Sequence, residues 1–197
     1  HRIYLHAVTA ENNYEFTLED WNLYDTIPAW REMLLGTVEE RMEKMRNEEM
    51  REAIRQTYKA HYTFVGSTTT NIHELIIGEV FSSSNEGYVG LTVGEVAEKE
   101  GLHPVDAMLD LALADKLQTH FVTPPQKYDM DAMRELANSP FAMPGLSDGG
   151  AHMKFLTMGR YPTEFIAKLV REHDVMDLEP AHWRLSTYPA VAAGVKE

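Results

Sequence analysis

A short apolar run that ends in an acid and two glycines is the feature that most constrains this chain. Residues 141–152 read FAMPGLSDGGAH, so Asp148 is followed at once by Gly149 and Gly150, and then by His152. A carboxylate at the C-terminal end of a buried strand is where α/β barrels place catalytic groups. The glycines can adopt positive φ and let the backbone turn away from the acid. The pattern makes Asp148 a candidate metal ligand or proton-transfer base, although Asp-Gly pairs also form ordinary turns.

Short apolar runs and helical patterns alternate in the rest of the chain. We expect strands at residues 3–8, 62–65, 74–81 and 121–122, and a further strand that ends at Asp148. Helical patterns separate the strands toward the C-terminal end, which favours the α/β class. The stretch from residue 9 to residue 27 is mostly polar and aromatic and is expected to be a long loop.

Two sequence signals for the start of a helix occur in the middle of the chain. Thr37 and Glu40, and again Thr92 and Glu95, have the three-residue spacing of a capping box. Residues 28–61 are charged, rich in methionine and without strand alternation. We therefore interpret this region as a mainly helical insertion in one domain that spans residues 1–197.

Composition limits the partners and the location of the chain. Its 197 residues can build one sizeable domain but fall below the ~250 residues that are typical of a complete (β/α)₈ barrel. Eighteen basic and 31 acidic residues give a net charge of −13, which disfavours nucleic acid and anionic membranes as partners. The absence of cysteine excludes disulfides and thiolate metal sites. No signal-peptide pattern and no run of ~18 apolar residues occurs, so the cytoplasm is the default expectation.

The spacing of the nine histidines does not by itself indicate a metal site. No His-x-His pair and no helical pair at the zinc-binding spacing of four occurs among them. His152 differs from the others because it lies just after the glycine pair, where it can reach a substrate carboxylate or a metal-bound water; a purely structural role stays open. His6 lies in the first expected strand, where a hydrogen-bonded structural role is favoured over one inside a barrel. Ser147 lacks the Gly-x-Ser-x-Gly pattern, so serine hydrolysis is disfavoured.

Three segments together resemble the amidohydrolase superfamily. They are GLSDGGAH (145–152), LEPAHWRLSTYPAVAAGV (178–195) and GLTVGEVAEKEGLHPVDAMLDL (90–111). Their order and spacing are similar to the C-terminal part of the branch that holds N-acyl-D-amino-acid deacylases and D-aminoacylase-like proteins.

The resemblance implies a partial (β/α)₈ TIM barrel of the metal-dependent hydrolase type that cleaves an amide C–N bond in a small-molecule substrate. It implies one or two divalent ions, expected to be zinc, with Asp148 both as metal ligand and as proton shuttle. His152 and Gly149 are the substrate-binding candidates. The other metal ligands of the family are not identifiable in this chain. We therefore expect it to be the C-terminal portion of a larger enzyme, completed by a missing N-terminal part or by another chain.

Two alternatives remain. The chain can be a non-catalytic fragment or assembly module that pairs with another chain through an apolar sheet edge. It can also be a metal-free hydrolase that uses Asp148 and His152 as an acid–base pair.

Overall fold

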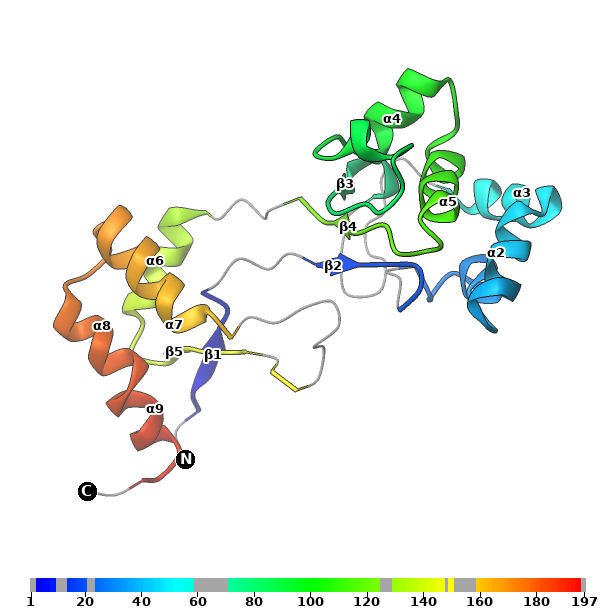
Figure 1. The fold of residues 1–197 in the computed structure, drawn as a ribbon. Coiled ribbons are helices and arrows are strands. Elements are labelled where there is room, and N and C mark those ends of the chain that lie inside the picture. Colours follow the sequence, from blue (N-terminus) through cyan, green and yellow to red (C-terminus); the bar gives the residue numbers. More distant parts are fainter. Residues whose placement is uncertain are drawn as a thin grey trace. The chain divides into compact units, whose positions relative to one another are not determined.

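The structure, a computed structural model, divides the chain into two units that are described separately (Figure 1). Unit 1 consists of His1–Asn12 and Pro125–Glu197, and unit 2 consists of Asn13–Pro124. The residues that the structure describes are 3–9, 14–20, 24–58, 71–124, 129–147, 149–150 and 159–195.

Unit 1 contains a pair of parallel strands. Strand β1 (Leu5–Ala7) pairs in parallel with β5 (Ala142–Pro144), and His6 lies opposite Met143. All three residues of β5 are buried, whereas β1 has one buried residue, Ala7. Two segments far apart in the sequence thus meet side by side, and β1 is the more exposed strand of the pair.

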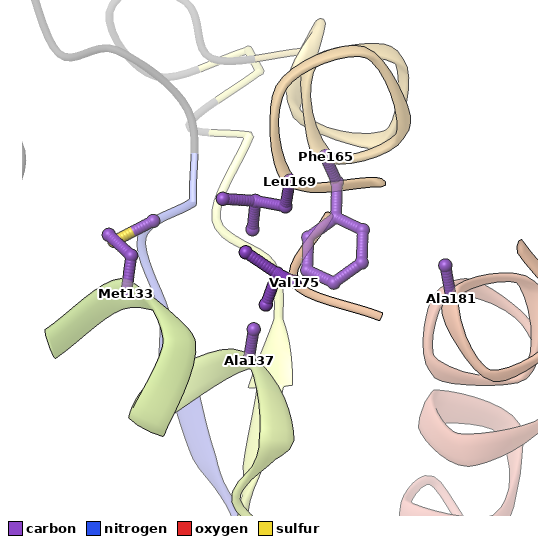
Figure 2. Packing of buried hydrophobic residues seen from close by; sticks show 6 residues of the cluster. All are labelled: Met133, Ala137, Phe165, Leu169, Val175 and Ala181. Carbon is purple, nitrogen blue, oxygen red and sulfur yellow. The ribbon is translucent and has the colours of Figure 1, made fainter. Parts of the chain in front are cut away.

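Helices pack around this pair in unit 1. They are α6 (Met130–Asn138), α7 (Tyr161–Glu164), the π-helical segment η3 (Phe165–Glu172), α8 (Leu178–Leu185) and α9 (Thr187–Ala192). Figure 2 shows Met133 and Ala137 of α6 directed toward Phe165, Leu169 and Val175. The spacing of four residues in each helix puts these side chains on one face, which is buried in the core of the unit.

Unit 2 contains a small antiparallel sheet in the strand order β2-β4-β3. These strands are β2 (Glu15–Phe16), β3 (Ile76–Ile77) and β4 (Phe121–Val122). Phe121 lies opposite Phe16 on one side and Ile77 on the other, and the two phenylalanine rings are 5.9 Å apart. The buried aromatic pair joins the two ends of unit 2 in sequence.

The helices of unit 2 come before and after residues 59–70 in the sequence, which are not among the described residues. They are α1 (Pro28–Met33), α2 (Val38–Arg46), α3 (Glu48–Thr57), the short helices η1 (Ile72–Glu74) and η2 (Glu86–Tyr88), α4 (Val93–Glu100) and α5 (Pro104–Ala114). Most residues of α5 are buried, because α3 and α4 both contact it. Trp30, Met45 and Ile54 are fully buried, one from each of α1, α2 and α3.

Both predicted capping boxes are confirmed. The Thr37 backbone N–H donates to Glu40 Oε2 at 2.8 Å, and the Glu40 N–H donates to Thr37 Oγ1 at 3.2 Å. Thr92 and Glu95 make the same reciprocal pair at the start of α4, with distances of 2.7 and 3.1 Å. These signals are local in the sequence, and they mark the residues at which α2 and α4 begin.

Two arginines of α3 hold α5 through one carboxylate. Arg55 Nη1 donates to both oxygens of Asp106, at 2.9 and 3.0 Å, and Arg51 Nη1 donates to Asp106 at 3.2 Å. Arg51 also pairs with the more exposed Asp110, at 2.6 Å. The Asp106 side chain is 13% exposed, so this pairing lies partly out of water and fixes α3 against α5.

The mixed α/β class is observed, but the described residues do not show the expected barrel. Their only parallel strands are β1 and β5, and the sheet of unit 2 is antiparallel. The strand expected at 74–81 is reduced to Ile76–Ile77, because η1 ends just before it. The expected loop at 9–27 contains β2, since Phe16 pairs with the distant β4.

Two further expectations have partial outcomes. Residues 28–57 contain α1, α2 and α3 in unit 2, while the interpretation of 28–61 as an insertion in one domain stays a prediction. The expected strand at 62–65 lies outside the described residues.

No helix in the described part of the chain is both long enough and apolar enough to cross a bilayer.

Candidate functional site

The C-terminal ends of β1 and β5 form the frame of the candidate site. Because the strands are parallel, both ends lie at the same edge of the pair. The Gly145 N–H, just beyond β5, donates to the carbonyl oxygen of Ala7 at 3.1 Å. The chain that leads to Asp148 therefore leaves the sheet beside the end of β1.

The backbone turns sharply after β5. Leu146 has a φ of +79°, a conformation that costs free energy for a residue with a side chain, and Gly150 has a φ of +90°. The N–H of Gly149 donates to Ser147 Oγ at 3.2 Å. The strand thus ends at Pro144, earlier than expected, and positive φ is found at Leu146 and Gly150 but not at Gly149.

Asp148 and His152 lie outside the described residues, so the structure leaves their roles untested. Gly149 is described and exposed, and its assignment to substrate binding stays a prediction. The structure does show what comes directly before the turn, which is the buried strand β5 in its parallel pairing with β1.

His6 is the histidine that the structure brings to this frame. A Cβ atom added at Gly145 would lie 2.8 Å from His6 Nδ1, so the ring packs against the bare backbone at the end of β5. His6 is exposed, and no hydrogen bond of its ring is seen within the described residues, so its expected structural role stays a prediction. Its position beside Gly145 depends on the register of two distant strands, which no local pattern in the sequence reveals.

No metal centre is assembled by the described residues. They contain no group of three or more His, Asp or Glu side chains placed to hold an ion. A zinc site needs four ligands as a rule, and three protein ligands even when it is catalytic. The residues described around β1 and β5 therefore do not fit zinc, and any further ligands would have to lie outside them.

A second group of aromatic and histidine side chains, in unit 2, has a structural role. Tyr58 Oη lies 3.0 Å from His73 Nδ1, and the Tyr58 ring meets the His103 ring edge-on at 4.7 Å. His103 Nδ1 accepts the Val105 N–H at the start of α5. Burial lowers the pKa of His103, an effect that the nearby Asp106 carboxylate opposes. The neutral ring is thus used as a helix cap.

An apolar groove of about 900 Å³ lies at the other end of the strand pair in unit 1. Its lining comes from the start of β1, the residues before β5, and helices α8 and α9: Ile3, Tyr4, Leu5, Pro140, Phe141, Trp183, Tyr188 and Val191. Among the described residues, none of those that line the groove is charged. Because it adjoins the N-terminal ends of the strands, it is separate from the turn that carries Asp148.

Comparisons with known proteins give partial matches. No protein-family model matches the chain. Curated relatives include three uncharacterized proteins, from two strains of Mycobacterium tuberculosis and from Mycobacterium bovis, that are 25% identical over 122 residues. The match covers 59% of this chain and 19% of each relative, so the chain spans about a fifth of the length of these relatives.

A partial structural likeness is found to the crystal structure of an N-acyl-D-glutamate deacylase from Bordetella bronchiseptica, complexed with zinc and a phosphonate inhibitor. The two chains are 22% identical, and the likeness covers 62% of this chain and 24% of the deacylase, with a TM-score of 0.37. At this TM-score the likeness does not define the fold of the chain.

Proposed function

We propose that the chain forms part of an enzyme that hydrolyses the amide C–N bond of an N-acyl amino acid in a metal-dependent reaction. The observation that carries the proposal is the strand and turn at residues 141–152. Its apolar run contains a buried strand, β5, that is parallel to β1. Positive φ at Leu146 and Gly150 then turns the backbone on both sides of Asp148. The proposal takes support from the fact that α/β barrel enzymes present catalytic carboxylates from the loops that follow such strands.

The proposed role of Asp148 is proton transfer. Its carboxylate accepts a proton from the water whose oxygen attacks the amide carbonyl. The C–O bond forms, and the same proton passes to the nitrogen as the C–N bond breaks. The products are a carboxylic acid and an amine. His152 and Gly149, close to Asp148 in sequence, are proposed to bind the substrate.

The metal requirement is proposed on the sequence resemblance alone. Asp148 cannot hold zinc by itself, and the described residues supply no set of partners for it. The proposal therefore assigns the remaining ligands to residues beyond the described ones, in this chain or in a partner that completes the enzyme. A cytoplasmic location stays a prediction.

A substrate screen tests this proposal. The purified chain is incubated with N-acetyl-D- and N-acetyl-L-amino acids carrying acidic, neutral and basic side chains, with and without added Zn²⁺, and release of the amine is measured. Zinc bound to the protein is determined in parallel by elemental analysis. Amine release that requires bound zinc supports the proposal. Amine release that survives EDTA would favour the metal-free pair of Asp148 and His152. Absence of amine release and of zinc would contradict a catalytic role for the chain alone.

A second candidate function is favoured by the apolar groove of unit 1. An exposed surface of this kind marks an interaction site in many proteins. A non-catalytic assembly module would use it to pair with another chain. Amine release by the purified chain, lost on addition of EDTA, would exclude this module as the sole function.

A further inference from the structure

The imidazole ring of His6 covers the bare backbone of Gly145. The three heavy atoms nearest to a Cβ atom built at residue 145 all belong to this ring: Nδ1 lies 2.8 Å from it, and Cγ and Cε1 lie 3.5 Å from it. Gly145 is buried, whereas Leu146, the next residue, is exposed. Ring atoms at these distances leave no room for a side chain at residue 145, so the ring packs directly against the chain where it leaves β5.

The register of the two strands produces this contact. His6 lies opposite Met143, and directly paired residues of parallel strands have their side chains on the same face of the sheet. Gly145 comes two residues after Met143, and positions two residues apart in a strand also share a face. The Gly145 N–H donates to the Ala7 carbonyl at 3.1 Å, so the pairing continues for one residue beyond β5. The His6 ring therefore lies over a residue whose backbone is bonded to the chain of β1.

The residue after Gly145 has a conformation that needs support from its surroundings. Leu146 has a φ of +79°, and a residue with a side chain keeps such a conformation only where the surrounding structure holds it. Two contacts act directly before this residue, on Gly145: the His6 ring packs against its Cα, and the Ala7 carbonyl accepts its N–H. The strained residue is thus supported from the side of β1.

We propose that His6 is a positioning residue for the proposed hydrolysis: its ring, packed against Gly145, sets the direction in which the chain leaves β5 toward Asp148. The inference rests on the proposed function, in which Asp148 transfers the proton. The ring acts through its shape and takes no part in the proton transfer. Position matters here because a displacement of about 1 Å at a reacting group can lower the rate by about 10²-fold. Asp148 follows Gly145 by three residues, so few rotatable bonds separate the contact from the acid.

Two substitutions of His6 separate the shape of the ring from its chemistry. His6→Ala removes the ring, whereas His6→Phe keeps a flat ring at the same place without nitrogen atoms that bind protons. Val8→Ala is the matched control, because Val8 lies two residues further along and supplies none of the three atoms nearest to residue 145. His6 and Val8 are both exposed, so all three variants are expected to fold, which circular dichroism checks.

The first measurement needs no enzymatic activity. NMR relaxation of the backbone amides of Gly145, Leu146 and Ser147 is measured in the parent chain and the three variants. His6→Ala is expected to lower the order parameters of these amides, which are about 0.85 in rigid backbone and below about 0.6 in flexible backbone. His6→Phe and Val8→Ala are expected to keep the values of the parent chain. Unchanged order parameters in His6→Ala would overturn the inference, and so would amides that are already flexible in the parent chain or an equal loss in Val8→Ala.

The second measurement is the steady-state kinetics of amine release by the same four chains. His6→Ala is expected to lower kcat by up to about 10²-fold with KM nearly unchanged, because the ring positions the acid and does not bind the substrate. His6→Phe is expected to keep most of the kcat and the pH profile of the parent chain. An equal loss of kcat in His6→Ala and His6→Phe would overturn the inference, since the ring nitrogens would then take part in the chemistry. A parent chain that releases no amine contradicts the proposed function, and the NMR measurement still decides whether His6 fixes the turn.

Discussion

The ring of His6 lies against Gly145, so close that a Cβ atom at residue 145 would approach Nδ1 to 2.8 Å. This contact joins the middle of β1 to the residue that follows β5, where the chain begins its turn toward Asp148. The absence of a side chain at Gly145 therefore leaves room for the His6 ring beside the end of β5.

Gly145→Ala is expected to displace the His6 ring and to lower the free energy of unfolding by about 1 kcal/mol, the typical cost of forcing a side chain from its preferred rotamer. The double variant with His6→Ala is expected to recover most of this loss, because the clashing atom is gone. Urea unfolding of the four chains measures the coupling. An equal cost of Gly145→Ala in both backgrounds would show that the strain comes from the backbone and not from His6.

Asp106→Asn is expected to destabilise unit 2 by about 2 kcal/mol, between the values for exposed and for buried ion pairs. The physical reason is that Arg51 and Arg55, 12% and 20% exposed at the side chain, lose the carboxylate that they share. Asp110→Asn is the matched control, because Asp110 is 50% exposed and its loss should cost less than about 1 kcal/mol. Equal effects of the two substitutions on urea unfolding would contradict the importance of the shared contact.

The cap at His103 predicts a loss of stability in acid. Burial lowers the pKa of His103 in the folded chain below its ordinary value of 6.5, so the unfolded chain binds the proton more readily. The free energy of unfolding should therefore fall as the pH drops from 6.5 toward the lowered folded pKa. His103→Asn keeps a capping side chain without titrating in this range, and its stability should fall less over the same interval. Parallel pH profiles for the two chains would exclude this contribution.

The stability of unit 1 is expected to depend on the guanidinium of Arg184. It donates to the backbone carbonyl oxygens of Asn138, Ser139 and Ala142, between the end of α6 and β5. Arg184→Ala is expected to cost about 2 kcal/mol, since partly buried carbonyl groups lose a charged donor. Arg171→Ala, at an exposed position of η3, is the control and should be nearly neutral. The measurement is thermal unfolding, and a control as damaging as Arg184→Ala would contradict the specific role.

Features that depend on neighbouring residues were predictable from the sequence. The capping boxes at Thr37 and Thr92 are examples, because each needs only a hydroxyl and a glutamate three residues apart. The helices from residue 28 onward follow from Pro28 and from the spacing of their buried residues.

Features that depend on distant residues were not predictable in the same way. Strand β2 has only two residues, and it is a strand because Phe16 meets Phe121 across more than half of the chain. The place of His6 beside Gly145 likewise results from the parallel register of β1 and β5. In the candidate site, the sequence predicts a role for Asp148 that stays a prediction, and it could not supply partners for this acid, since such partners come together only through tertiary structure.

The proposed proton transfer by Asp148 is tested by measuring the kcat/KM of Asp148→Asn on the N-acyl amino acid that the parent chain hydrolyses fastest. Asp174→Asn is the matched control, because Asp174 is exposed and its φ of +48° is one that asparagine also adopts. Loss of a proton-transfer group typically lowers the rate by about 10²–10⁴-fold. A loss of this size in Asp148→Asn, with full activity in Asp174→Asn, is the predicted result. Unchanged turnover in Asp148→Asn would contradict the claim.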